Sequence, residues 1–257
     1  MQLLIQIFIL KLDLKNSMNT FQFIRSNNYL PLIIFAVSMG FLEAIVVVYL
    51  RELYYPNGFQ FPLKEMPPSI IIIEWTREIC TLLMLGSVAW ISGKILVKRL
   101  SVLLFIFGVW DIIYYVGLKI FLDWPESLLT WDILFLIPIT WVGPVLAPVL
   151  CSLLMIIFAV VLDKLILKNN LKKLVKPEWI LLISGAAFIY FTFTFDFGVI
   201  LINGHFLRDF SNLPKNPEFL KILSNWIPSH FNWSVFAAGF IIICSSIWLI
   251  VKRSKDN

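Results

Sequence analysis

The stretch IIIIEWTREICTLLML, residues 70–85, decides how the chain must fold, because it places three charged side chains inside an apolar run. These are Glu74, Arg77 and Glu78, and the run continues to Ile91, which makes it long enough to cross a membrane. A charged side chain near the centre of a spanning helix costs about 2.5–3.5 kcal/mol on insertion scales. We therefore expect this face of the helix to meet protein, or water held by protein, rather than lipid.

The composition of the whole chain agrees with a membrane location. Of its 257 residues, 60% are hydrophobic and only 14% are charged, and the mean hydropathy is +0.87. Soluble globular domains carry about 25% charged residues. The net charge of +5 comes from basic residues that cluster between apolar runs, a pattern that sets membrane topology and differs from the even basic surface of a nucleic-acid-binding protein. The sequence thus predicts a polytopic membrane protein that contacts the lipid bilayer and no nucleic acid.

Six apolar runs have lengths close to the ~20 residues that a helix needs to cross a bilayer. We predict an all-α transmembrane helix bundle, with a cytoplasmic N-terminal segment over residues 1–29, a transmembrane domain over 30–251 that includes an outer loop over 201–233, and a cytoplasmic tail over 252–257. The expected spans are residues 30–50, 70–91, 100–121, 133–162, 180–200 and 235–251.

The fourth run is too long for one straight span and contains Pro138, Gly143, Pro144 and Pro148. Proline removes a backbone donor and clashes with the preceding helical turn. We therefore predict that this span is kinked or broken in its outer half. A broken helix at membrane depth is tolerated where the freed backbone lines a cavity inside the protein.

The distribution of basic residues predicts the orientation of the bundle. Of the 21 Lys and Arg residues, 14 fall in the segments on one side of the six runs and 6 on the other, and Arg77 lies within a run. By the positive-inside rule, both termini are expected in the cytoplasm.

Acidic residues within the spans fall in their outer halves, and no comparable acid was found in an inner half. This asymmetry predicts one polar site near the outer side. Its acids outnumber its basic residues, so at least one carboxyl is expected to bind a proton or a cation. The candidate residues for a substrate, cation or proton site are Glu43, Glu74, Arg77, Glu78, Asp111, Tyr115, Lys119 and Asp196.

Metal and nucleophile motifs are weak in this sequence. Cys80, Cys151 and Cys244 each lie in an apolar run, without metal-ligand or redox spacing, and are expected to be packing residues. His205 and His230, in the expected outer loop, are weak candidates for a metal ligand. No catalytic residue and no cofactor are assigned from these patterns.

The segments 40–56, 74–85, 108–125 and 131–148 resemble those of a family of bacterial multi-pass integral membrane proteins whose activity is uncharacterised. The resemblance covers about the first two thirds of the chain. It implies a location in the bacterial cytoplasmic (inner) membrane, and it implies no activity.

Three functions remain open at this point. The first is cation- or proton-linked transport of a small solute through the outer site, for which six spans would favour a homodimer. The second is a membrane-embedded enzyme, with or without a metal, that acts on a lipid-linked or extracytoplasmic substrate. The third is a structural or assembly subunit, in which the buried charges would pair completely and leave no solvated cavity.

Overall fold

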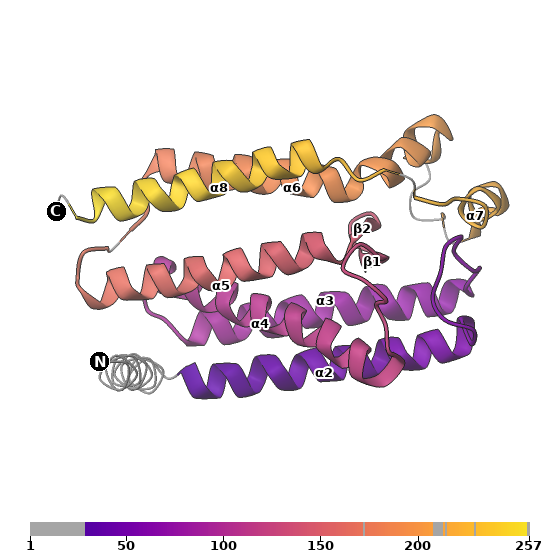
Figure 1. Cartoon of the computed structure of the whole chain (residues 1–257), viewed down its shortest axis with the longest axis horizontal. Helices are drawn as coiled ribbons and strands as arrows, with labels where there is room; N and C mark the ends of the chain where they lie inside the picture. Colours follow the sequence, from indigo (N-terminus) through magenta and orange to yellow (C-terminus); the bar gives the residue numbers. More distant parts are fainter. Residues whose placement is uncertain (1–28, 172, 208–212, 214, 229, 256–257) are drawn as a thin grey trace, which may run out of the picture.

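The computed structural model describes residues 29–171, 173–207, 213, 215–228 and 230–255 (Figure 1). The expected cytoplasmic segment over residues 1–29 thus lies outside the described residues, except for Tyr29. In chain order, the helices and strands are α2 (Tyr29–Tyr54), α3 (Pro68–Ile91), α4 (Leu96–Leu122), β1 (Trp131–Phe135), β2 (Trp141–Pro144), α5 (Leu146–Leu167), α6 (Lys176–Asn203), α7 (Pro217–Leu223) and α8 (Trp233–Arg253).

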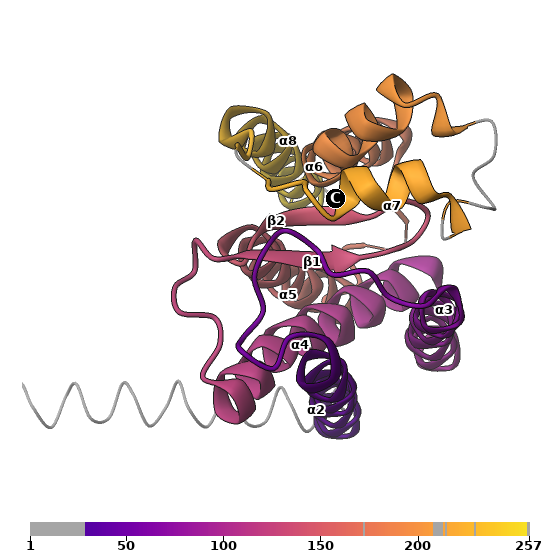
Figure 2. The same ribbon diagram turned by 90° about the vertical axis from the view of Figure 1, so that its right-hand side faces the viewer.

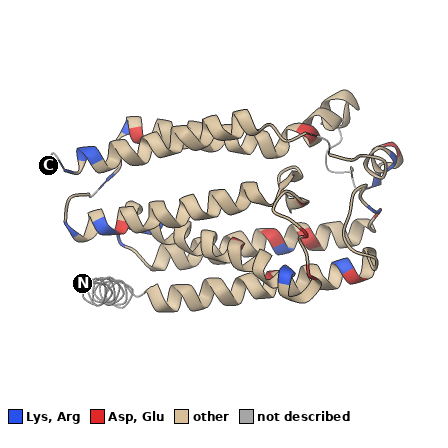
Figure 3. Cartoon of the chain, viewed as in Figure 1, with Lys and Arg blue, Asp and Glu red and all other residues tan. Residues whose placement is uncertain are grey.

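Five helices are long and apolar enough to cross a membrane, namely α2, α4, α5, α6 and α8. The chain is therefore an integral membrane protein. Helix α3 has 24 residues, which is also a spanning length, but every 18-residue stretch of it contains Glu74, Arg77 and Glu78, whereas each of the other five has an apolar stretch with fewer charges. Figure 3 shows charged residues mainly toward the two ends of the bundle and on α3.

The long helices run antiparallel to one another in chain order and form two layers (Figure 1). Helices α6 and α8 form one layer, and helices α2, α3, α4 and α5 form the second layer beside it (Figure 2). The start of α2 and the end of α8 lie at the same end of the bundle, which we call the terminal end. The opposite end carries β1, β2 and α7, and we call it the hairpin end.

The predicted break in the fourth apolar run is present, but its outer part is a β-hairpin, so the expectation of an all-α fold is wrong here. Strands β1 and β2 pair antiparallel, with Trp131 opposite Pro144 and Asp132 opposite Gly143, and α5 begins only at Leu146. Pairing across the hairpin satisfies peptide groups that a proline-broken helix would leave exposed. Pro138 lies in the connection between the two strands.

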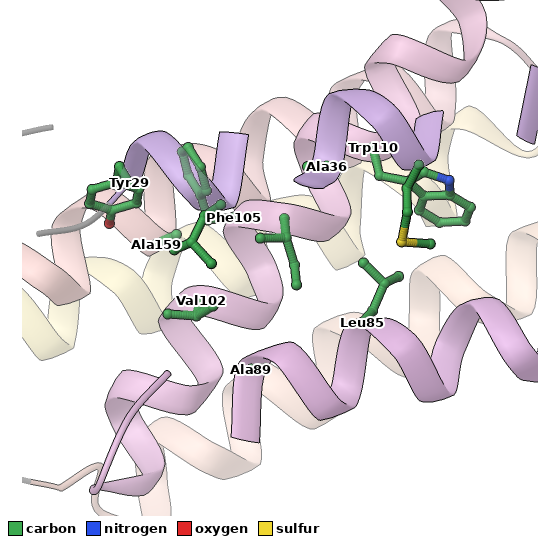
Figure 4. Close-up of a cluster of buried hydrophobic side chains, with 11 residues drawn as sticks. Tyr29, Ala36, Leu85, Ala89, Val102, Phe105, Trp110 and Ala159 are labelled. Carbon is green, nitrogen blue, oxygen red and sulfur yellow. The ribbon is translucent and has the colours of Figure 1, made fainter. Parts of the chain in front are cut away.

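The largest apolar core joins α2, α3, α4 and α5 (Figure 4). Leu85 of α3 and Ile106 of α4 are fully buried in it, as are Ala36 of α2 and Ala159 of α5. Because lipid tails are as apolar as these side chains, such helices associate through close van der Waals contact and hydrogen bonds rather than through the hydrophobic effect.

Helices α6 and α8 approach closely at two glycines. A Cβ atom on Gly185 would lie 2.6 Å from Ile243 Cγ1 and 2.8 Å from the carbonyl oxygen of Gly239. Small residues at such crossings let two backbones pack tightly in a membrane. Helices α6 and α8 therefore form a unit of their own, which meets the rest of the bundle mainly through clusters at its two ends.

The expected outer loop, residues 201–233, contains the short helix α7. Its buried Phe219 contacts Phe197 of α6 and Phe206 in edge-to-face geometry. Asn216 caps the helix by accepting hydrogen bonds from two backbone N–H groups. Helix α7 thus covers the hairpin end of α6.

Two further buried acids, Asp163 and Glu178, lie at the terminal end of the helices and were not among the candidate residues. Asp163 of α5 accepts hydrogen bonds from Tyr29, Lys98 and Ser101, at 2.5, 2.6 and 2.7 Å. Glu178 of α6 is ion-paired with Arg253 of α8 at 2.7 Å. Both acids lie just outside the sequence runs chosen as spans, and both serve to tie helices together.

The close approach of α6 and α8 predicts different outcomes for two alanine substitutions in α6. Gly185→Ala places a methyl group against Gly239 and Ile243, so it should destabilise the protein by about 1–3 kcal/mol, as overpacked cores do. Gly198→Ala has nothing within 4 Å of its new Cβ and should be neutral or stabilising. Thermal unfolding of both variants in detergent checks this, and equal unfolding temperatures would contradict the packing described here.

Candidate functional site

Arg77 of α3 is the centre of a cluster of three glutamates. Its Nε atom donates to Glu74 Oε2 at 2.8 Å, and its Nη1 atom is paired with Glu43 of α2. Its Nη2 atom lies 4.0 Å from Glu78 Oε1. Glu74 and Arg77 are three residues apart, so they share a helix face and the ion pair forms locally. One guanidinium therefore neutralises part of three carboxylates and joins α3 to α2.

Glu78 connects this cluster to the β-hairpin. Both of its carboxylate oxygens accept the backbone N–H of Leu136 at 3.0 Å, and Oε2 also accepts that of Ile137 at 3.2 Å. These N–H groups belong to the connection between β1 and β2, where no strand partner is available to them. Hydrogen bonds from backbone N–H groups to an ionised carboxylate are stronger than neutral ones. Glu78 thus fixes irregular backbone at the site.

A second buried ion pair lies nearer the hairpin end. Arg51 Nη2 of α2 donates to Asp132 Oδ1 of β1 at 3.0 Å, and both side chains are buried. The Arg51 guanidinium also lies 3.7 Å from the ring centroid of Trp124 and 4.6 Å from that of Phe59. Among the described residues, Arg51 Nη1 and Asp132 Oδ2 have no hydrogen-bond partner although both atoms are buried. The aromatic rings and the tight burial thus hold the Arg51 guanidinium in place beside Asp132.

Asp111 of α4 is deeper in the bundle and has a single neutral donor. Ser152 Oγ of α5 donates to Asp111 Oδ2 at 2.7 Å. No ion pair to Asp111 is found among the described residues. Tyr115, one helical turn further along α4, is buried next to Asp132. Asp111 is thus a part-buried carboxylate without a cation beside it.

These charged groups face one cavity of about 130 Å³, which we call the acid cavity. This volume is enough for several water molecules. Five carboxylates and two guanidiniums line it, an excess of three negative charges if all are ionised. Its charged lining residues are Glu43, Arg51, Glu74, Arg77, Glu78, Asp111 and Asp132.

Most of the residues that the sequence singled out meet at this cavity. Besides the five charged candidates from the spans, Tyr115 lines it. The charged residues that the sequence analysis did not select are Arg51 and Asp132. Arg51 lies near the end of its span and Asp132 directly before an apolar run, positions that are also typical of ordinary boundary residues.

Lys119 and Asp196 do not reach the acid cavity. Lys119 is exposed, and its Nζ atom lies 2.7 Å from Asp123 Oδ1 beyond the end of α4. The hydrogen bond and charge of Lys119 lower the pKa of the exposed Asp123 carboxyl. Asp196 lies on α6, close enough to His230 for an electrostatic interaction, and is not among the residues that line the cavity. Similar depth in the membrane therefore did not bring these residues to the same site.

The two histidines lie outside the acid cavity. His205 and His230 are both exposed. In the described part of the chain, no three His, Cys, Asp or Glu side chains are grouped so that they could hold a metal ion. Cys80 and Cys244 are exposed on the helices, and Cys151 is part-buried.

Comparisons with known proteins give no further guide to the chemistry of this site. No known protein family, curated protein or solved structure matches the chain.

The role of Arg77 predicts a large effect of its removal. Arg77→Gln leaves three carboxylates without their shared cation, and breaking a partly buried ion pair of this kind should cost about 2–4 kcal/mol. Arg77→Lys should recover only part of this loss, because an ammonium cannot reach several carboxylates with a rigid fork. Thermal unfolding in detergent measures both effects.

Lys119→Gln provides the matched control, since it also removes a basic residue near the hairpin end but from an exposed position. Its unfolding temperature should stay close to that of the native protein. If Arg77→Gln were as stable as Lys119→Gln, the cluster would not depend on Arg77.

Proposed function

We propose that the acid cavity binds a proton or a small cation and that this binding is linked to transport of a small solute across the membrane. The observation that carries the proposal is the excess of carboxylates over guanidiniums around one cavity, five against two. Uncompensated charge inside a membrane protein is costly, and such residues are typical of ion pathways and proton relays. A bound proton or cation removes that cost.

The surroundings of the cavity support a transport site. The β-hairpin supplies irregular backbone beside Glu78, and irregular backbone at membrane depth is typical of ion and substrate sites in transporters. Toward the terminal end, the cavity gives way to the apolar core, since Trp110 belongs to both and Leu85 lies one turn beyond Thr81 of its lining. This arrangement favours entry of an ion or solute into the cavity from the hairpin end.

A purely structural role for the charges is less well supported. That role requires every buried polar group to find a partner inside the bundle. Arg51 Nη1, Asp132 Oδ2 and Trp110 Nε1 are buried and have no partner among the described residues, and all three residues line the acid cavity. Asp111 also lines the cavity, and no ion pair to it is found among the described residues, so an uncompensated carboxylate favours a site that binds a proton or a cation.

For the membrane topology, we propose six spans with α3 as the sixth. Its antiparallel place between α2 and α4 and its charged face toward protein support this assignment. The excess of basic residues at the terminal end supports cytoplasmic termini. The family resemblance supports the bacterial cytoplasmic membrane, and the small number of helices favours a homodimer.

The proposed topology predicts which ends of the bundle a membrane-impermeant maleimide reaches. In a background where Cys80, Cys151 and Cys244 are replaced by Ala, Asn57→Cys should be labelled in intact spheroplasts. Lys168→Cys should be labelled only after lysis. Both positions are exposed, at the hairpin and terminal ends respectively. The reverse labelling pattern would overturn the orientation.

Proton movement tests the function itself. In proteoliposomes with an imposed pH gradient and an internal pH dye, the native protein should carry protons faster than empty liposomes do. Glu78→Gln and Asp111→Asn should each lose most of this flux, because each removes an acid that lines the cavity. Glu52→Gln, an exposed acid on α2, should keep it.

Infrared difference spectroscopy then separates a proton from another cation as the bound ion. A protonated acid in the cavity should give a carboxylic-acid C=O band at neutral pH, which weakens in Glu78→Gln or Asp111→Asn. If sodium or potassium ions are bound instead, adding them should change the carboxylate bands of the native protein only. Native flux in both variants, without either spectral change, would falsify the proposal.

A further inference from the structure

An apolar hollow between the two layers lies beside the acid cavity, and we call it the groove. It has a volume of about 440 Å³ and is bounded by α4, α5, α6 and the β-hairpin. Along α6 its lining extends from Trp179 to Phe193. At 1.5 Å per residue this corresponds to a length of roughly 21 Å, which is most of a ~30 Å hydrocarbon core.

The groove exists because the α6–α8 unit contacts the other helices mainly at its ends. At the terminal end, Leu162 and Phe158 pack with Ile250. At the hairpin end, Ala147 packs with Phe193. Between these two clusters, the Gly185 crossing holds α6 against α8 instead of against α5. A hollow therefore remains in the middle of the spans, where the surrounding solvent is lipid hydrocarbon.

The groove has one charged group. Four residues of α4 line it along a single helix face, namely Leu100, Leu104, Phe107 and Asp111, and Asp111 lies at the hairpin-end limit of this face. Among the described residues that line the groove, Asp111 alone is charged. An otherwise apolar channel that ends at a carboxylate is complementary to a molecule with one hydrocarbon chain and a cationic end.

Aromatic rings close the groove near this carboxylate. Phe135 and Trp141 line it, with ring centroids 5.4 Å apart, and the Trp141 ring lies 5.0 Å from that of Tyr190. An ammonium group is attracted to the faces of such rings as well as to a carboxylate. A carboxylate or phosphate head would instead meet Asp111 with the same sign of charge.

We propose that the groove binds a single-chain membrane amphiphile, with its hydrocarbon chain along α6 and an ammonium head at Asp111. Asp111, Leu134 and Phe135 line both the groove and the acid cavity, so the head lies at the border between the two. The amphiphile is then the class of solute that the acid cavity handles. Only the statement that the amphiphile is the transported solute rests on the proposed function, since binding of its hydrocarbon chain in the groove requires no ion movement.

Photolabelling of the purified full-length protein in detergent tests the proposal. Hexadecylamine that carries a diazirine on its chain should label peptides of α5 and α6 that line the groove. Unlabelled hexadecylamine should compete for labelling about tenfold better than hexadecanoic acid, and hexadecanol should fall between them, because only the amine pairs with Asp111. Asp111→Asn should remove the preference for the amine.

Two neighbouring substitutions on α6 provide a matched pair. Ala186→Phe fills the groove and should reduce labelling about tenfold. Ala187→Phe changes an exposed position outside the lining and should leave labelling unchanged. Both should unfold at the native temperature, because both original side chains are exposed.

The results separate this inference from the proposed function. Native labelling of Ala186→Phe, label spread evenly over all helices, or equal competition by the acid and the amine would overturn the amphiphile site. Labelling that meets every expectation above, together with proton flux no greater than in empty liposomes and no change of the carboxylate bands on adding sodium or potassium ions, would instead overturn the transport proposal and leave the amphiphile site standing. Glu52→Gln, which changes an exposed acid outside the groove lining, should keep native labelling.

Discussion

The interaction on which the rest of the structure depends is the contact of the Arg77 guanidinium with three glutamates. Helix α3 has the length of a membrane span but carries too much charge to face lipid alone. Arg77 solves this by pairing with Glu74 on its own helix and with Glu43 on α2. The charges that would keep α3 out of the membrane thus link it to α2, while its apolar residues pack on α4.

The β-hairpin follows from the same chemistry. A chain that leaves helical structure at membrane depth exposes peptide groups that need partners. Strand pairing supplies most of them, and Glu78 accepts the remaining N–H groups of Leu136 and Ile137. The hairpin in turn brings Asp132 to Arg51. Helix α3 and the β-hairpin therefore stabilise each other, and residues of both line the acid cavity.

Local patterns in the sequence predicted a membrane protein of long apolar helices, the break in the fourth run and the charged face of α3, because each depends on residues near one another in the chain. The pairing of Arg51 with Asp132 joins residues 81 positions apart, so it cannot be predicted from the local spacing of residues along the sequence. Lys119 and Asp196 were selected by depth, which says nothing about the direction in which a side chain points around the bundle. The prolines of the fourth run indicated a break in the helix. They did not predict a β-hairpin, because strand pairing depends on which residues lie opposite one another.

The position of these partners along the chain has a consequence for biogenesis. Glu43 is synthesised before Arg77, so α2 can already offer its carboxylate when α3 emerges from the ribosome. The backbone groups that bind Glu78 follow it by 58 and 59 residues, after all of α4. Until the ribosome reaches them, Glu78 depends on Arg77 and on water for its partners. The interval in which α4 is made is therefore the stage at which the nascent chain most needs the insertion machinery to shield it.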